Sequence, residues 1–157
     1  MKQLVAFLFV MLSIALSPYA QKEAVMTNHA RGTFDVTVTP QAPDNVAGGP
    51  FGRLFLDKQF HGDLEATSKG QMLAAGTAVE SSAGYVALEL VTGTLNGRRG
   101  SFILQHTGTM TKGVPTMIVT VVPDSGTDQL TGMAGKMTII IADGKHSYEL
   151  AYTLAGA

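Results

Sequence analysis

The chain has 157 residues, a formal net charge of −1 and only 15% charged side chains. This length suits one domain with a substantial core. The weak charge argues against a nucleic-acid-binding surface, which needs clustered Lys and Arg, and leaves no polybasic patch for anionic lipid. The sequence contains no cysteine, which excludes disulfides, a lipidated-cysteine anchor and thiolate metal sites.

The first twenty residues are typical of a cleavable signal peptide. Lys2 precedes an apolar run from Leu4 to Leu16, which is too short to cross a hydrocarbon core that needs about 20 residues. We expect cleavage after Ala20, an exposed lead-in over 21–30 and a single domain over 31–157. A secreted or periplasmic protein without a stable membrane anchor after processing follows from this expectation, and an uncleaved N-terminal anchor is the alternative.

Two-residue alternation dominates the rest of the chain. Phe34, Val36 and Val38 alternate with polar residues, which is typical of a half-buried strand. Strand-like runs recur at 53–60, 63–67, 71–80, 85–95, 100–111, 116–122, 136–142 and 147–154, and Gly62 is interpreted as a bulge between the first two of these. The segment 40–52 reads as a long loop that can serve as a lid.

This succession of strands predicts an all-β domain. A small antiparallel up-and-down barrel of about eight strands is favoured over a sandwich, because closure removes exposed sheet edges. No long helical period, internal repeat or second domain is evident.

Several sequence motifs carry a resemblance to a known family. They are FHGDL at 60–64, ELVTGTLNGR at 89–98, GSFILQHTGT at 100–109, VPDSGT at 122–127, LTG at 130–132 and DGKHSY at 143–148. With them the chain resembles, from residue 60 to 154, an uncharacterised bacterial domain-of-unknown-function family with an allene-oxide-cyclase-like (calycin-like) β-barrel. The resemblance implies the barrel but no reaction, and the leader departs from the many family members that look cytoplasmic.

Asn96-Gly97 is the strongest hairpin signal in the chain. A two-residue turn here pairs Glu89 with Leu104 and Ala87 with His106, whereas a four-residue loop sets Glu89 opposite His106. In both registers one strand face carries Tyr85, Glu89, Val91, Phe102, Leu104 and His106. A three-residue loop would break this arrangement. We favour this face as the lumen because it holds the larger aromatics; if the other face lines the lumen, Gln105 becomes the polar contact.

An acid and an imidazole among apolar side chains are candidate catalytic groups. Glu89 and His106 can act as general acid, general base or orienting group. The alternative interpretation is a structural pair that joins two strands, either inside or on the outer face. Asp143-Gly144 is interpreted as a second two-residue turn, which pairs Ile139 with Tyr148 and Met137 with Leu150. These residues form either a pocket wall or ordinary core packing. The candidate ligand-binding residues are Tyr85, Glu89, Phe102, Leu104, His106, Tyr148 and Tyr152.

No cofactor or metal is predicted. The four histidines lack metal-ligand spacing, Ser125 lacks a nucleophile elbow, and the glycine-rich stretches are hairpin ends without a following helix. Three functions remain: a module that binds a small apolar molecule in the barrel mouth, an isomerase or cyclase that uses Glu89 and His106, or a structural or interaction protein with a filled barrel. The sequence leaves open whether the chain forms a homo-oligomer.

Overall fold

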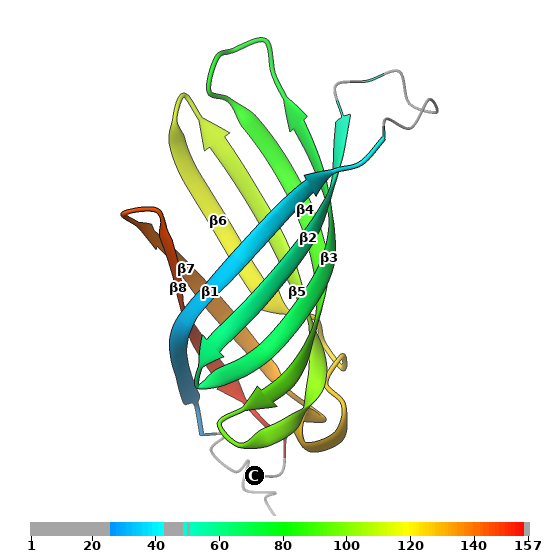
Figure 1. Cartoon of the computed structure of the whole chain (residues 1–157), viewed down its shortest axis with the longest axis vertical. Helices are drawn as coiled ribbons and strands as arrows, with labels where there is room; N and C mark the ends of the chain where they lie inside the picture. Colours follow the sequence, from blue (N-terminus) through cyan, green and yellow to red (C-terminus); the bar gives the residue numbers. More distant parts are fainter. Residues whose placement is uncertain (1–25, 43–48, 50, 156–157) are drawn as a thin grey trace, which may run out of the picture.

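A computed structural model describes residues 26–42, 49 and 51–155 (Figure 1). The predicted signal peptide and most of the predicted lid loop lie outside these residues. The described elements are β1 (Asn28–Pro40), β2 (Phe51–Gly62), β3 (Leu64–Gly76), β4 (Ala83–Leu95), β5 (Arg98–Thr111), β6 (Val114–Val121), the 3₁₀ turn η1 (Asp128–Leu130), β7 (Ala134–Ala142) and β8 (Lys145–Thr153). Each strand pairs antiparallel with the next, and β8 pairs with β1 to close the barrel. The predicted all-β barrel is confirmed.

The period of two decides which side chains face the lumen. Along β4, Ala87, Glu89 and Val91 are buried, whereas the intervening Leu88 and Leu90 are about half exposed. The same alternation continues across the barrel because paired residues of neighbouring strands share a face. The face that carries Glu89 and His106 is therefore the inner one, as the sequence favoured.

The two hairpin turns that the sequence singles out have the predicted length. Asn96 and Gly97 both adopt positive φ, 46° and 78°, as a two-residue turn that matches strand twist requires. Leu95 consequently pairs with Arg98, and Glu89 lies opposite Leu104. Asp143-Gly144 repeats this conformation and sets Ile139 opposite Tyr148.

The interpretation of Gly62 as a bulge is wrong. Phe60 pairs with Ala66, so the chain reverses around Asp63, directly after Gly62, whose φ of 106° suits glycine. The reversal is held to β1, since the Asp63 N–H donates to the Arg31 carbonyl. Beyond the turn, β3 runs without a break through residues 68–70, where the sequence suggests two separate runs.

β1 begins at Asn28, inside the expected lead-in, because residues 28–34 pair with β8 and complete the closure.

The lumen is filled at one end and exposed at the other. The end that carries the β2–β3 and β4–β5 turns, here called the closed end, is packed with fully buried side chains: Phe60, Leu95, Phe102, Tyr148 and Leu150. Towards the opposite, open end, inward-facing apolar residues regain solvent contact. Val38 is 46% exposed, Met117 39% and Ile141 61%. The barrel therefore has a solid base and an apolar inner wall that solvent reaches.

The seam between β6 and β7 is the weakest junction of the barrel. Among the described strand pairs it holds only two register positions, Val119 with Met137 and Thr120 with Lys136. Segments 114–118 and 138–142 continue towards the open end without pairing to each other, while each remains paired to its other neighbour. The facing strand edges thus carry backbone groups that the ladder leaves unused.

Candidate functional site

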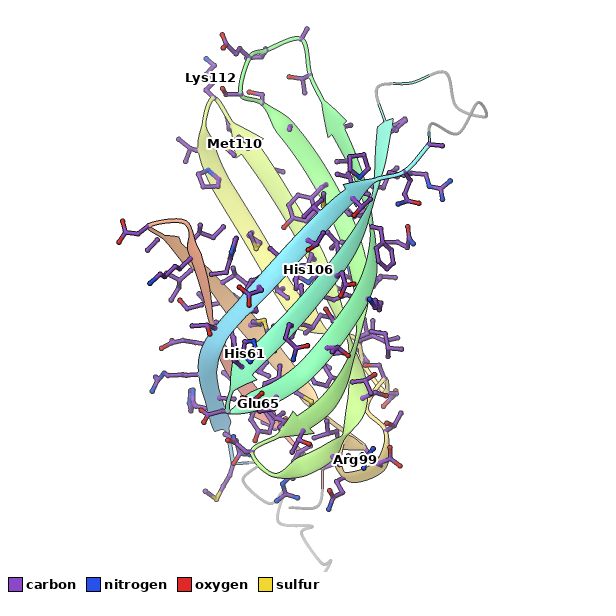
Figure 2. All side chains as sticks on the ribbon, viewed as in Figure 1. His61, Glu65, Arg99, His106, Met110 and Lys112 are labelled. Carbon is purple, nitrogen blue, oxygen red and sulfur yellow. The ribbon has the colours of Figure 1, made fainter. Side chains whose placement is uncertain are left out.

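Four consecutive strands each contribute one buried polar side chain to the lumen. Lys58 comes from β2, Ser68 from β3, Glu89 from β4 and His106 from β5. None of them is more than 6% exposed. Figure 2 shows His106 between Met110, which lies towards the open end, and Glu65, which lies at the closed end. We call these four residues the polar cluster.

Glu89 is the centre of the polar cluster. Its Oε1 accepts hydrogen bonds from Lys58 Nζ and His106 Nε2, each at 2.8 Å. Its Oε2 accepts the Ser68 hydroxyl at 2.9 Å. Both carboxylate oxygens are therefore satisfied, and a fully buried carboxylate is tolerated because each contact favours its charged form.

The charge of Glu89 is set by two opposing effects. Burial raises the pKa of this carboxyl, but the His106 hydrogen bond and the positive charge of Lys58 outweigh burial and lower the pKa from 4.5 to about 2. Lys58 Nζ also lies 5.1 Å from the Phe34 ring centroid and 5.8 Å from that of Phe60, so the aromatic faces help to hold the ammonium.

The hydrogen bond to Glu89 assigns a tautomer to His106. A carboxylate can only accept, so Nε2 carries the proton, and in the neutral ring Nδ1 then keeps a free lone pair. No described residue forms a hydrogen bond to Nδ1. His106 is 3% exposed, and no fully buried side-chain nitrogen or oxygen in the described part of the chain lacks a partner, so Nδ1 keeps only slight solvent contact. A carboxylate that orients an imidazole whose second nitrogen keeps its lone pair is an arrangement suited to proton transfer.

Two glycines leave space beside the polar cluster. A Cβ at Gly70 would approach Glu89 Cβ to 2.7 Å, so the glycine lets the Glu89 side chain lie against β3. A Cβ at Gly108 would come within 2.2 Å of the Tyr85 ring, which therefore lies across this glycine. Gly108 is the next inward position after His106 towards the open end. Burial raises the pKa of Tyr85, and the negative charge of Glu89 adds to the effect.

The other candidate ligand-binding residues pack deeper in the barrel. Leu104 is fully buried opposite Glu89, and Phe102 lies one inward position further towards the closed end. Tyr148 Oη accepts the Leu64 N–H at 2.9 Å and donates to the His61 carbonyl at 3.3 Å. Tyr152 Oη accepts Asn96 Nδ2–H at 3.0 Å. These two hydroxyls tie the turns of the closed end to β8.

Sequence reasoning missed Lys58 and Ser68. Lys58 lies between Leu56 and Phe60 on the inward positions of β2, so the alternation itself could have identified it. Ser68 falls at 68–70, between the two strand-like runs that the sequence predicts at 63–67 and 71–80. Its inward position follows only from the continuous β3.

The described residues offer no metal site. Nowhere in this part of the chain do three or more His, Cys, Asp or Glu side chains gather in a way that could hold an ion. The His146 ring packs against the Phe34 ring, with centroids 5.1 Å apart and planes tilted by 35°. Within residues 26–42 and 51–155, no helix is long and apolar enough to span a membrane.

These features define the class of protein. It is an eight-stranded antiparallel barrel that is filled at one end and holds a buried cluster of Lys, Ser, Glu and His. Residues 30–152 match the model of the family described as "Protein of unknown function (DUF3224)", and the chain belongs to this family. The family resemblance in the sequence is thereby confirmed.

A solved structure supports both family and fold. The crystal structure of a DUF3224 protein of unknown function from Shewanella oneidensis MR-1 is similar, with 48% identity and a TM-score of 0.78. The match covers 84% of this chain and 100% of that one. No curated protein matches the chain.

Proposed function

We propose that the protein binds a small, largely apolar molecule in the open half of the barrel, above the polar cluster. The observation that carries the proposal is the solvent contact of inward-facing apolar residues at this end, among them Val38, Met110 and Met117. Soluble barrels of eight strands are wide enough to hold one small ligand. Ligand sites are mostly apolar, with a few polar groups that fix orientation.

The polar cluster supplies the orienting groups at the base of this proposed site. Lys58 has three N–H donors, of which one is used by Glu89. His106 Nδ1 is the accepting atom of the same cluster. We therefore expect a ligand with one polar end, which meets these two groups, and an apolar body, which lies against the inner wall and Tyr85.

Two routes would lead to the proposed site. One is the open end itself. The other is the β6–β7 seam, where the strands are joined by only two register positions and can separate at little cost in backbone hydrogen bonds.

A neutral fluorescent probe tests the proposal. N-phenyl-1-naphthylamine brightens in apolar surroundings, and Val38→Asp places a charge on the inner wall of the open end. The matched control is Thr39→Asp, because Thr39 is the next residue along β1 and faces outwards. We expect Val38→Asp to weaken probe binding about tenfold or more and Thr39→Asp to leave it unchanged. Equal binding by both variants would contradict an internal site.

The natural ligand can be sought directly. Native mass spectrometry of protein purified from its own host should show a retained small molecule on the wild type and less of it on Val38→Asp. Apo protein in every preparation, together with no displaceable probe binding, would favour a structural protein instead.

The His106 arrangement supports a second candidate, an isomerase or cyclase. In this alternative, Nδ1 would take a proton from a carbon of the bound substrate and return it to another atom, while Glu89 stabilises the imidazolium. The test is proton exchange: the molecule retained by the wild type should acquire deuterium from D₂O, and His106→Gln should abolish the uptake without releasing the molecule. Binding without any exchange would leave the binding module as the function.

We also propose that the protein acts after export. The proposal rests on Lys2 and the apolar run 4–16, and cleavage after Ala20 would leave every described strand intact, because β1 begins at Asn28.

A further inference from the structure

The outer surface of the barrel is divided into two chemically different halves. On one side, outward positions of β1, β2, β7 and β8 carry charges, including Arg31, Asp57, Lys136 and Glu149, and Arg31 pairs with Glu149 at 2.7 Å. On the other side, outward positions within 71–75 of β3, 84–90 of β4, 103–109 of β5 and 116–120 of β6 hold no Asp, Glu, Lys or Arg. We call this second surface the uncharged face.

The uncharged face is also apolar. Leu73, Val86, Leu88, Leu90 and Ile118 are each between 44% and 54% exposed. They are neighbours, since Leu73 pairs with Val86, and Val86 and Ile118 both pair with Thr107. Apart from Glu89 and the Tyr85 hydroxyl on its inner face, β4 is apolar on both faces over 84–91, a pattern typical of strands that are covered on both sides. Contiguous apolar patches on a soluble protein mark interaction sites.

The surface shape of the uncharged face suits contact with a folded protein. Two adjoining hollows of about 470 Å³ and 670 Å³ lie along it, and Leu73 and Val86 line both. The hollows form where small residues such as Ala75 and Gly84 stand beside taller ones. Ridges of Leu and Val next to such hollows are the features that interdigitate when two sheets pack face to face.

We propose that the uncharged face is the interface of a homodimer in which two copies of this chain pack sheet against sheet. A twofold interface brings the same patch of both copies together, so a charge near its centre would meet its own like. The outward positions of the four strands of this face carry no charge over these ranges, and Arg53 of β2, which lines the larger hollow beside Leu73, stands at the edge of the face. The nearly neutral chain, with a formal net charge of −1, adds little long-range repulsion. A strongly charged partner would find only Arg53, at the edge of the face, to complement it.

The size of the face is adequate for such a contact. Four strands spaced about 4.8 Å apart, with a rise of about 3.3 Å per residue along 84–90, cover roughly 19 by 23 Å. This flat area of roughly 440 Å² per copy, about 880 Å² for two copies, lies at the low end of interface sizes and suits a dimer that forms at micromolar concentrations.

Sedimentation of the mature protein tests the proposal. Wild type at tens of micromolar should sediment at twice the mass of one chain. Val86→Asp and Val86→Lys, which put either charge at the centre of the face, should each raise the dimer dissociation constant about 100-fold, because a symmetric contact would bury two unpaired charges. Thr33→Asp, on an outward position of β1, is the matched control and should remain dimeric.

Circular dichroism melting separates dissociation from unfolding, since the Val86 variants should keep a cooperative transition. A monomeric wild type would overturn the proposal, and so would a dimer that both charges leave intact. A wild type that stays monomeric and binds neutral phosphatidylcholine vesicles through Val86 would reassign the face to a membrane surface.

Discussion

Glu89→Gln is the perturbation that reports most directly on the polar cluster. The variant keeps the shape of the side chain but removes the negative charge, so Lys58 stays buried without an anionic partner. The pKa of Glu89 falls from 4.5 to about 2 on folding. At about 1.4 kcal/mol for each pKa unit, the charged carboxylate contributes about 3 kcal/mol to the free energy of unfolding near neutral pH.

The sign of this effect fixes its pH dependence. Because the pKa is lower in the folded state, the stabilisation is fully present above pH 4.5 and is lost as the pH falls towards about 2. Wild type should therefore be about 3 kcal/mol more stable than Glu89→Gln near neutral pH, and the two stability curves should converge near pH 2. The expected fall in melting temperature near neutral pH is roughly 10 °C.

Urea unfolding followed by far-ultraviolet circular dichroism, repeated across this pH range, measures both quantities. Glu149→Gln is the matched control, because Glu149 forms an exposed ion pair with Arg31 that is worth about 1 kcal/mol or less. A difference below about 1 kcal/mol for Glu89→Gln, or one that does not change with pH, would refute the described charge arrangement.

Three further predictions concern the cluster, the seam and the leader. The triple variant Lys58→Met, Glu89→Leu and His106→Leu should have a free energy of unfolding within about 2 kcal/mol of wild type, because apolar residues can replace buried ion pairs. It should nevertheless lose the selective binding of ligands with a polar end. Failure to fold would show that the cluster is structural. Hydrogen exchange by NMR should find that amides of 138–142 that point towards β6 exchange faster than their alternate neighbours bonded to β8, and uniform protection would mean a closed seam. N-terminal sequencing of exported protein should begin near Gln21, and retention of Met1 would contradict signal-peptide cleavage.

Local signals in the sequence account for most of the fold. The Asn-Gly and Asp-Gly turns demand positive φ at both positions, so they determine register and thereby set Glu89 diagonally to His106. Alternation then identified the inner face. The bulge predicted at Gly62 is wrong because a glycine with positive φ serves a bulge or a reversal equally well, and only the pairing of Phe60 with Ala66 distinguishes the two.

The candidate site was predictable only in part. The Glu89–His106 contact spans one hairpin and follows from a single turn. The contacts of Lys58 and Ser68 with Glu89 depend on how β2, β3 and β4 stagger around the closed barrel, which no local pattern specifies. The uncharged face could not be predicted for a different reason. The sequence predicts the strands that carry its residues, but only the assembled barrel shows that these residues of four strands lie side by side.

The methionines provide the most direct test of ligand binding in the open half. Met110 and Met117 lie on the exposed inner wall, at 38% and 39% exposure, whereas Met133 is 1% exposed. With methionine labelled by ¹³C in its methyl group, titration of N-phenyl-1-naphthylamine should shift the NMR signals of Met110 and Met117 and leave that of Met133 unchanged. Saturable probe binding that shifts neither Met110 nor Met117 would contradict the account.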